Sequence, residues 1–215
     1  MSAPRTEPGA RLTLRRLVGL DRSGPSPVQT RSGQPLRPFT IPNLVGYLRL
    51  AAIPVFLYLA LDSSDGRTAT TSILFAAIAG SDYLDGLLAR VTGQYSRMGA
   101  LLDPVVDRLT VLAGVVVCWH FELLPRWALA VLAVRELATL VLAQIALRRG
   151  LQLEINWVGR ISVWPVMAGI FFAITVGGAL GEVLYFVGLV LALLATVLYV
   201  RVARAALAAP ARAAG

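Results

Sequence analysis

Six long apolar stretches follow one another along the chain after Thr40, separated by short polar breaks. A helix that crosses a lipid bilayer needs about 20 mainly apolar residues, and each of these stretches has roughly that length. The pattern therefore predicts six transmembrane helices, at 41–61, 70–90, 97–118, 127–147, 157–177 and 182–201. The fold class that follows is all-α, a polytopic membrane protein whose six transmembrane helices form a bundle.

The regions on either side of the apolar stretches have a different composition. Residues 1–9 and 21–37 are rich in Pro, Gly, Ser and Arg, which indicates a basic and mostly flexible tail. Between them, residues 10–20 place Leu at roughly helical spacing with Arg in between. This segment is either a juxtamembrane amphipathic helix lying on the membrane surface or a further part of a disordered tail. The expected organisation is a tail over 1–38, a membrane domain over 39–204 and a C-terminal tail over 205–215.

Composition and charge support a membrane location. Apolar residues make up 57% of the chain and charged residues only 15%, which is unlike a soluble domain. All 20 basic residues are Arg, and they gather before Pro38, between residues 148 and 160, and after Val200. Because positive charge collects on the cytoplasmic side of membrane helices, we expect both termini and the turn at 91–96 in the cytoplasm. The net charge of +8 suits the anionic lipids of a cell membrane and requires no nucleic-acid partner.

Four of the seven aspartates lie close together, inside two adjacent apolar stretches. A carboxylate at membrane depth costs a few kcal/mol or more, so a cluster of them indicates a functional site. Asp82 and Asp85 are three residues apart, and Asp103 and Asp107 are four apart, so each pair occupies one face of its helix. Two helices that offer two carboxylates each would form an all-oxygen site, which suits hard divalent cations.

These aspartates belong to a longer pattern, Asp-x2-Asp-Gly-x2-Ala-Arg-x8-Gly-x3-Asp-x3-Asp, which runs from Asp82 to Asp107. The pattern resembles the signature of the CDP-alcohol phosphotransferase family at every fixed position. The resemblance implies a membrane enzyme in which an alcohol attacks the β-phosphate of CDP-diacylglycerol and CMP leaves. It implies two Mg²⁺ or Mn²⁺ ions held by Asp82, Asp85, Asp103 and Asp107, with Asp107 also acting as the general base. Family members commonly form homodimers.

The other residues of the pattern are candidates for binding the CDP-lipid. Gly86 and Ala89 leave one helix face without bulk, so that a nucleotide can lie against the backbone. Arg90 can reach the pyrophosphate, and Gly99 allows the second and third helices to approach each other. Ser96 is expected to cap the third helix, and its position in the family pattern also places it at the nucleotide.

A second group of polar residues opens the first predicted helix, where Pro42-Asn43 is followed by Arg49. Two interpretations are open. Asn43 and Arg49 anchor the helix in the lipid headgroup layer, or they border the nucleotide site. A similar Pro-Asn-x5-Arg opening does the latter in the branch of the family that makes phosphatidylglycerophosphate.

Arg135 in the fourth predicted helix and Arg160 in the fifth are candidates for binding the acceptor. Guanidinium groups bind phosphate well, and similar Arg-Glu and Gly-Lys segments line the acceptor site in the same branch of the family. Arg135 lies too deep in its helix to reach the membrane surface. Adjacent residues on a helix point to different faces, so we expect its partner elsewhere in the bundle interior rather than at Glu136.

The acceptor expected first is glycerol 3-phosphate, which would give phosphatidylglycerophosphate, because of Pro42-Asn43, Arg135-Glu136 and Gly159-Arg160. Phosphatidylglycerol, which would give cardiolipin, and inositol phosphate, which would give phosphatidylinositol phosphate, are the alternatives. A more distant alternative is an ion-coupled transporter, since transporter sites also contain intramembrane acids. Such proteins often have helices broken by Gly or Pro in corresponding halves, and this sequence has no such pair.

Overall fold

The computed structural model describes residues 35–148 and 157–208, and every regular element in these two ranges is a helix. The elements are α2 (Ile41–Leu61), α3 (Ala69–Thr92), α4 (Arg97–His120), α5 (Arg126–Arg148), α6 (Trp157–Thr175) and α7 (Ala179–Ala208). They correspond one for one to the six predicted membrane helices, so the all-α helical bundle is confirmed. α7 continues four residues into the segment predicted as the C-terminal tail, and the 10–20 segment lies outside the described residues.

Polar residues in the short breaks determine where the helices begin. Thr40 precedes α2, and its hydroxyl accepts a hydrogen bond from the N–H of Asn43. Thr68 precedes α3, and its hydroxyl accepts one from the N–H of Thr71. Each cap gives a partner to an N–H that the first helical turn leaves open and stabilises the helix by about 1 kcal/mol. The helix starts are therefore encoded by residues next to them in the chain.

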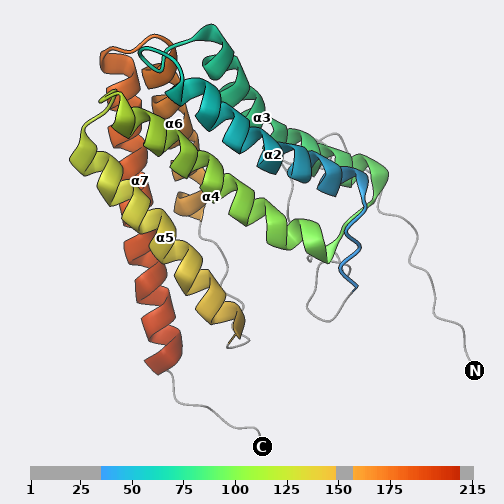
Figure 1. The fold of residues 1–215 in the computed structure, drawn as a ribbon. Helices are drawn as coiled ribbons and strands as arrows, with labels where there is room; N and C mark the ends of the chain where they lie inside the picture. The colour runs from blue at the N-terminus through green and yellow to red at the C-terminus, as the bar shows by residue number, and fades with distance from the viewer. Residues whose placement is uncertain (1–34, 149–156, 209–215) are drawn as a thin grey trace, which may run out of the picture.

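α4 runs through the middle of the bundle (Figure 1), with α2 and α3 packed on one side and α5 and α6 on the other. α7 packs on α5 and α6. The α2–α3, α4–α5 and α6–α7 loops meet at one end, where Arg67 Nε donates to the Ala173 carbonyl at 3.2 Å and Gly66 lies against the Phe121 ring. The turn between α3 and α4, which the acidic pattern spans, lies at the opposite end of these two helices.

α6 and α7 make the closest helix pair because glycines lie where the two backbones meet. A Cβ on Gly188 would lie 2.4 Å from the backbone nitrogen of Val166, and one on Gly169 would lie 2.5 Å from that of Tyr185. Small residues at such positions let membrane helices gain van der Waals contact along their length. The Tyr185 hydroxyl also donates to the Ala128 carbonyl at 3.0 Å, which ties α7 to α5.

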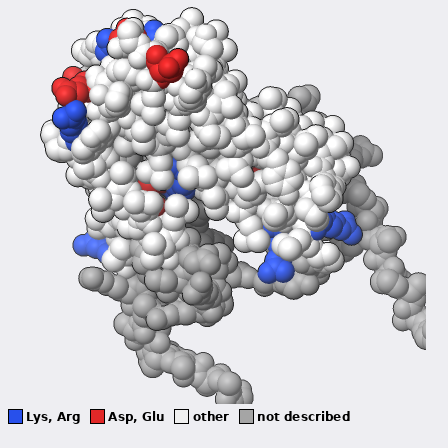
Figure 2. Space-filling view, in the orientation of Figure 1, with Lys and Arg blue, Asp and Glu red and all other residues white. Residues whose placement is uncertain are grey.

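Within the described residues, three helices are long and apolar enough to cross a membrane: α2, α3 and the Ala179–Leu198 part of α7. α6 contributes a shorter apolar stretch, Ile161–Thr175, and α4 carries the charges of the acidic pattern. Charged side chains on the face in Figure 2 gather toward the ends of the molecule, with a small group in a hollow between them. Uncharged surface covers most of the remaining area, as expected of a bundle surrounded by lipid.

Candidate active site

The turn at 93–96 folds α3 and α4 into an antiparallel hairpin, and this hairpin brings two of the aspartates level with each other. Asp82 lies ten residues before the end of α3 at Thr92, and Asp107 lies ten residues after the start of α4 at Arg97. Equal distances from a shared turn place the two side chains opposite each other. The sequence pattern is thus converted into a pair of carboxylates on neighbouring helices.

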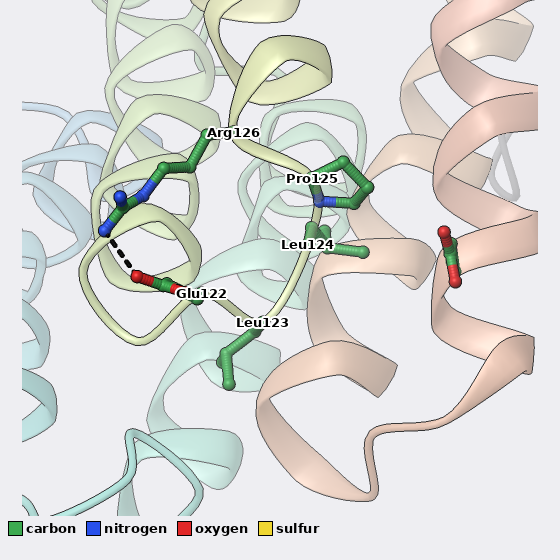
Figure 3. Close-up of a pocket in the computed structure, with 6 residues that line it drawn as sticks. Glu122, Leu123, Leu124, Pro125 and Arg126 are labelled. Atoms are coloured by element: carbon green, nitrogen blue, oxygen red, sulfur yellow. Dashed lines mark ion pairs between the residues drawn. The ribbon is translucent and has the colours of Figure 1, made fainter.

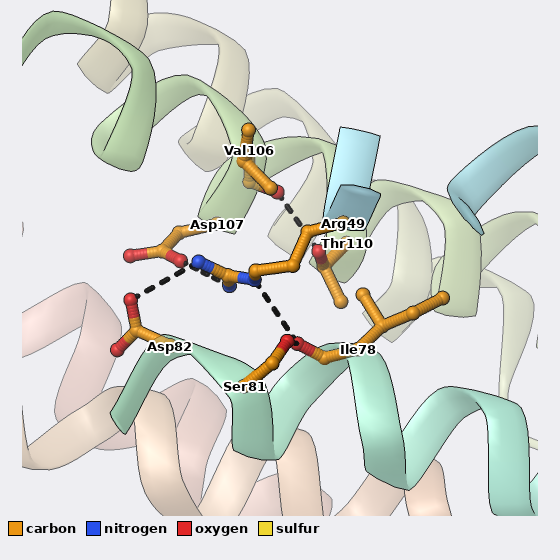
Figure 4. Close-up of polar contacts among 7 residues, drawn as sticks. All are labelled: Arg49, Ile78, Ser81, Asp82, Val106, Asp107 and Thr110. Carbon is orange, nitrogen blue, oxygen red and sulfur yellow. Dashed lines mark hydrogen bonds and ion pairs between the residues drawn. The ribbon is translucent and has the colours of Figure 1, made fainter. Parts of the chain in front are cut away.

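Arg49 of α2 joins the two carboxylates (Figure 4). Its Nη1 donates to Asp82 Oδ1 at 3.2 Å and its Nη2 donates to Asp107 Oδ1 at 2.8 Å. Its Nε donates to the backbone carbonyl of Ile78 at 3.2 Å, which fixes the plane of the guanidinium group. Charge-assisted hydrogen bonds of this kind are stronger than neutral ones. One side chain therefore links α2, α3 and α4 at the level of the acidic pattern.

The three side chains differ strongly in exposure. The Arg49 side chain is only 2% exposed, whereas those of Asp82 and Asp107 are 51% and 41% exposed. The neighbouring hydroxyls of Ser81 and Thr110 donate to backbone carbonyls of their own helices. The cation is thus on the inner side of the site, and the two carboxylates reach from it toward the open side.

Asp85 and Asp103 are the remaining two aspartates of the acidic pattern. Asp103 is half-buried one helical turn before Asp107, and the side chain of Asp85 lies outside the described set. Among the side chains that the structure does describe, no three His, Cys, Asp or Glu are grouped closely enough to hold a metal ion. The donors nevertheless fit a hard cation, because carboxylates from two helices already converge on one positive group.

Asn43, Ser96 and Gly99 form a second cluster, at the turn. Ser96 Oγ donates to Asn43 Oδ1 at 2.8 Å and accepts from the N–H of Gly99 at 2.9 Å, so Ser96 caps α4 as predicted. Asn43 Nδ2 donates to the carbonyls of Arg37 and Pro38, both at 3.0 Å. A Cβ on Gly99 would lie 2.7 Å from Asn43 Oδ1, so any other residue there would force the Asn43 side chain to shift. The cluster fixes the start of α2 against the start of α4.

Gly86, Ala89 and Arg90 lie together on the last turns of α3, and all three are half-buried. A Cβ on Gly86 would lie 3.4 Å from Arg90 Nη1, so the guanidinium group folds back over the bare backbone at Gly86. This arrangement places a cation directly over the part of the helix face that has no bulk.

Arg135 lies apart from these residues, on α5. Its Nε donates to Thr196 Oγ1 of α7 at 3.1 Å, which agrees with a partner in the bundle interior. Its Nη1 also pairs with Glu136, so the expectation that these adjacent residues would not pair was wrong. Long side chains can curl toward each other even when their Cβ atoms point to different faces. The side chain of Arg160, on α6, lies outside the described set.

A shallow pocket at the loop end of the bundle contains none of the predicted site residues (Figure 3). It is lined by Glu122, Leu123, Leu124, Pro125, Arg126 and Glu182. Glu122 and Arg126 form an ion pair at 2.8 Å on one side of it, and both side chains are more than half exposed. The pocket lies beyond the end of α4 opposite the acidic pattern, so it is not a second face of the same site.

A family model described as CDP-alcohol phosphatidyltransferase matches residues 39–208, which is most of the chain. The chain belongs to the CDP-alcohol phosphatidyltransferase family. It is therefore a member of a family of membrane-bound transferases of phospholipid biosynthesis. The family uses CDP-diacylglycerol and an alcohol as substrates and generally uses divalent metal ions.

Two relatives illustrate the range of named activities. A CMP-forming cardiolipin synthase of Streptomyces coelicolor is 40% identical over 144 residues, which cover 65% of this chain and 67% of the relative. A CDP-diacylglycerol–glycerol-3-phosphate 3-phosphatidyltransferase of Bacillus subtilis is 30% identical over 138 residues, which cover 59% of this chain and 72% of the relative. The aligned stretch is thus about two thirds of each relative's length, and the two relatives differ in their named acceptor chemistry.

Arg108 is a further buried-network residue of this phosphatidyltransferase bundle that the sequence pattern did not single out. Arg108 follows Asp107 on α4, and its Nη1 pairs with Glu136, which also pairs with Arg135. Glu136 is only 3% exposed, so the three residues form an ion network inside the bundle across α4 and α5. The signal was available, because an arginine within an apolar membrane helix implies a partner. The identity of the partner depended on the packing of α4 against α5 and could not be read from the sequence.

Proposed function

We propose that the protein transfers a phosphatidyl group from CDP-diacylglycerol to an alcohol and releases CMP. The observation that carries the proposal is the meeting of Asp82 and Asp107 from two helices around one cation, within a sequence pattern that matches the family at every fixed position. The half-exposed carboxylates face outward, where a substrate can reach them.

In the proposed reaction the acceptor hydroxyl oxygen forms a bond to the β-phosphorus, and the bond from that phosphorus to the CMP oxygen breaks. Asp107 accepts the hydroxyl proton as the general base, and the electron pair of the broken bond leaves with CMP. Asp82, Asp85, Asp103 and Asp107 would hold two Mg²⁺ or Mn²⁺ ions, which when bound would neutralise charge on the pyrophosphate. The position of the Asp107 carboxylate beside the acceptor hydroxyl matters more than its intrinsic basicity, because an ordinary carboxylate is a weak base.

The CDP-lipid would lie along the end of α3. Gly86 and Ala89 carry no bulky side chain there, and Arg90, whose guanidinium group lies over Gly86, would bind the pyrophosphate. Asn43, Ser96 and Gly99 support this site by holding α2 and α4 together at the turn. Because Asn43 is 2% exposed and bonded through both its nitrogen and its oxygen, its contribution is to shape the site.

Two acceptors fit the relatives, and we propose phosphatidylglycerol, which would give cardiolipin. The case for glycerol 3-phosphate rests on two guanidinium groups for a dianion, but Arg135 is buried and engaged by Glu136 and Thr196. The relative that is 40% identical is a cardiolipin synthase.

Glycerol 3-phosphate is the second candidate. The Asn43 and Arg49 opening of α2 resembles the branch that makes phosphatidylglycerophosphate, and the Bacillus subtilis relative is named for that acceptor.

The distribution of arginines supports a protein of the cell membrane whose active site and two termini face the cytoplasm. A homodimer is proposed from the family resemblance alone.

An acceptor screen tests the function directly. Purified protein in nanodiscs would receive CDP-diacylglycerol and Mg²⁺ with phosphatidylglycerol, glycerol 3-phosphate or inositol phosphate, and both CMP and the lipid product would be measured. We expect CMP release matched by cardiolipin formation. Formation of phosphatidylglycerophosphate alone would replace the acceptor and keep the reaction class, whereas absence of CMP with every acceptor would contradict the proposed function.

A further inference from the structure

Arg49 is the only charged residue of α2, and it is 3% exposed. A cation at such a position is costly unless negative partners surround it. Asp82 and Asp107 supply those partners, and the Ile78 carbonyl accepts from the remaining edge of the guanidinium group. Figure 4 shows the guanidinium pointing at both carboxylates from one side, with Arg49 entering from the side of α2.

These contacts distinguish the role of Arg49 from that of the residues that would bind the lipid substrate. An arginine that contacts a pyrophosphate needs donors on the open side of the site. Arg49 instead points its donors at two carboxylates and a backbone carbonyl and has almost no exposed surface. To reach a substrate phosphate it would have to give up bonds that hold three helices together.

We propose that Arg49 is a positioning residue of the phosphatidyl-transfer site, a built-in counter-cation that holds Asp82 and Asp107 in place and opposes the binding of divalent cations to them. The inference rests on the proposed function for its role in turnover. The expected effect of the Arg49 charge on cation binding depends only on the observed contacts with Asp82 and Asp107. Two nearby carboxylates repel each other, and a positive group bonded to both offsets that repulsion. The same positive charge repels a second cation that approaches the same oxygens.

Two variants separate the charge of Arg49 from its forked shape. Arg49→Gln removes the charge, so we expect Mn²⁺ to bind about tenfold more tightly or better. The same variant also removes the Arg49 hydrogen bond that holds Asp107, the general base, in position. A displacement of that carboxylate on the order of 1 Å can lower kcat about 10²-fold. Arg49→Lys keeps the charge but cannot fork to both carboxylates. Its Mn²⁺ affinity should stay near that of the unchanged protein, with an intermediate kcat. The KM for CDP-diacylglycerol should stay within about threefold in both variants, because no substrate contact is lost.

The measurements are Mn²⁺ binding by electron paramagnetic resonance on the full chain without substrate, and steady-state kinetics with CDP-diacylglycerol. Arg67→Gln is the matched control, since Arg67 Nε also donates to a backbone carbonyl, that of Ala173, at the other end of the bundle. It should leave Mn²⁺ affinity and kcat unchanged. Mn²⁺ binding without activity in the unchanged protein would contradict the proposed function while still testing the charge effect.

Unchanged or weaker Mn²⁺ binding by Arg49→Gln would overturn the proposal. A large rise in the KM for CDP-diacylglycerol with kcat unchanged would also overturn it and would assign Arg49 to lipid binding. If Arg49→Gln does not fold, Arg49→Lys decides: retained Mn²⁺ affinity with reduced kcat supports the proposal, and a change confined to KM contradicts it.

Discussion

Two buried arginines are accommodated in different ways at the level of single residues. Arg49 is shared between carboxylates that stay open to the outside, whereas Arg135 shares a deeply buried carboxylate, Glu136, with Arg108. The first arrangement leaves acidic oxygens available for chemistry. The second leaves its only carboxylate enclosed, with 3% of Glu136 exposed, so its role is to join helices. Burial of the acid thus distinguishes the reaction site from the structural network.

We predict that Asp107→Asn lowers kcat about 10²–10⁴-fold, the usual contribution of a general base. The amide oxygen can still accept from Arg49 Nη2, so the geometry of the site and the binding of CDP-diacylglycerol should largely persist. Kinetics and a lipid-binding assay on the same preparation measure the two effects. Asp65→Asn, in the α2–α3 loop, is the control and should have no effect on turnover. Near-normal turnover of Asp107→Asn would show that Asp107 is not the general base.

Glu136→Gln should destabilise the protein strongly. The change leaves Arg108 and Arg135 without their shared counter-charge, and breaking a buried ion pair from one side costs about 3–5 kcal/mol. The matched control is Glu122→Gln, whose ion pair with Arg126 is exposed and contributes about 0–1 kcal/mol. The free energy of unfolding, measured by detergent titration in mixed micelles, tests the difference. Equal losses in the two variants would contradict the network.

At the level of elements, the α6–α7 pair depends on the absence of side chains at the contact. Gly188→Ala would place a methyl group 2.4 Å from the backbone nitrogen of Val166, so one helix must move. We expect a loss of about 1–3 kcal/mol in the free energy of unfolding, typical of overpacking. Gly80→Ala on α3 is the control, because a Cβ there meets nothing within 4 Å, and it should be neutral or stabilising by up to about 1 kcal/mol. Similar stabilities of the two variants would argue against close contact.

Most of the element-level description could be predicted from the sequence, because apolar length and polar breaks are local properties. The six helices and the Ser96 cap follow from such patterns. The partners of Arg49 and Glu136 could not be predicted, since they depend on which helices pack together and how they are rotated. The pairing of Arg135 with its neighbour was missed because spacing rules describe Cβ directions and not the reach of a long side chain.

On the scale of the whole molecule, the reaction site exists only when α2, α3 and α4 are assembled. None of these helices alone gathers enough oxygen ligands for a hard cation. We expect turnover to require a divalent cation. Removal with excess chelator should abolish it and Mg²⁺ or Mn²⁺ should restore it, since carboxylates favour these ions over softer metals. The measurement is CMP release before chelation, after chelation and after each addition. Full turnover in excess chelator would exclude a metal-dependent site.

The shape of the bundle also bears on how the acceptor arrives. Large apolar side chains cover the outer faces of α2, α5 and α7, so lipid surrounds the site from the side, while a water-soluble acceptor must come from the membrane surface. If phosphatidylglycerol is the acceptor, the rate should follow its mole fraction in the bilayer and fall when neutral lipid dilutes it. Changing the total amount of nanodiscs at constant composition should then leave the rate per enzyme unchanged. The readout is cardiolipin formed at fixed CDP-diacylglycerol mole fraction, with neutral phosphatidylcholine as diluent. A rate that instead saturates with dissolved glycerol 3-phosphate and does not change with the mole fraction of phosphatidylglycerol would show that the site uses the soluble acceptor.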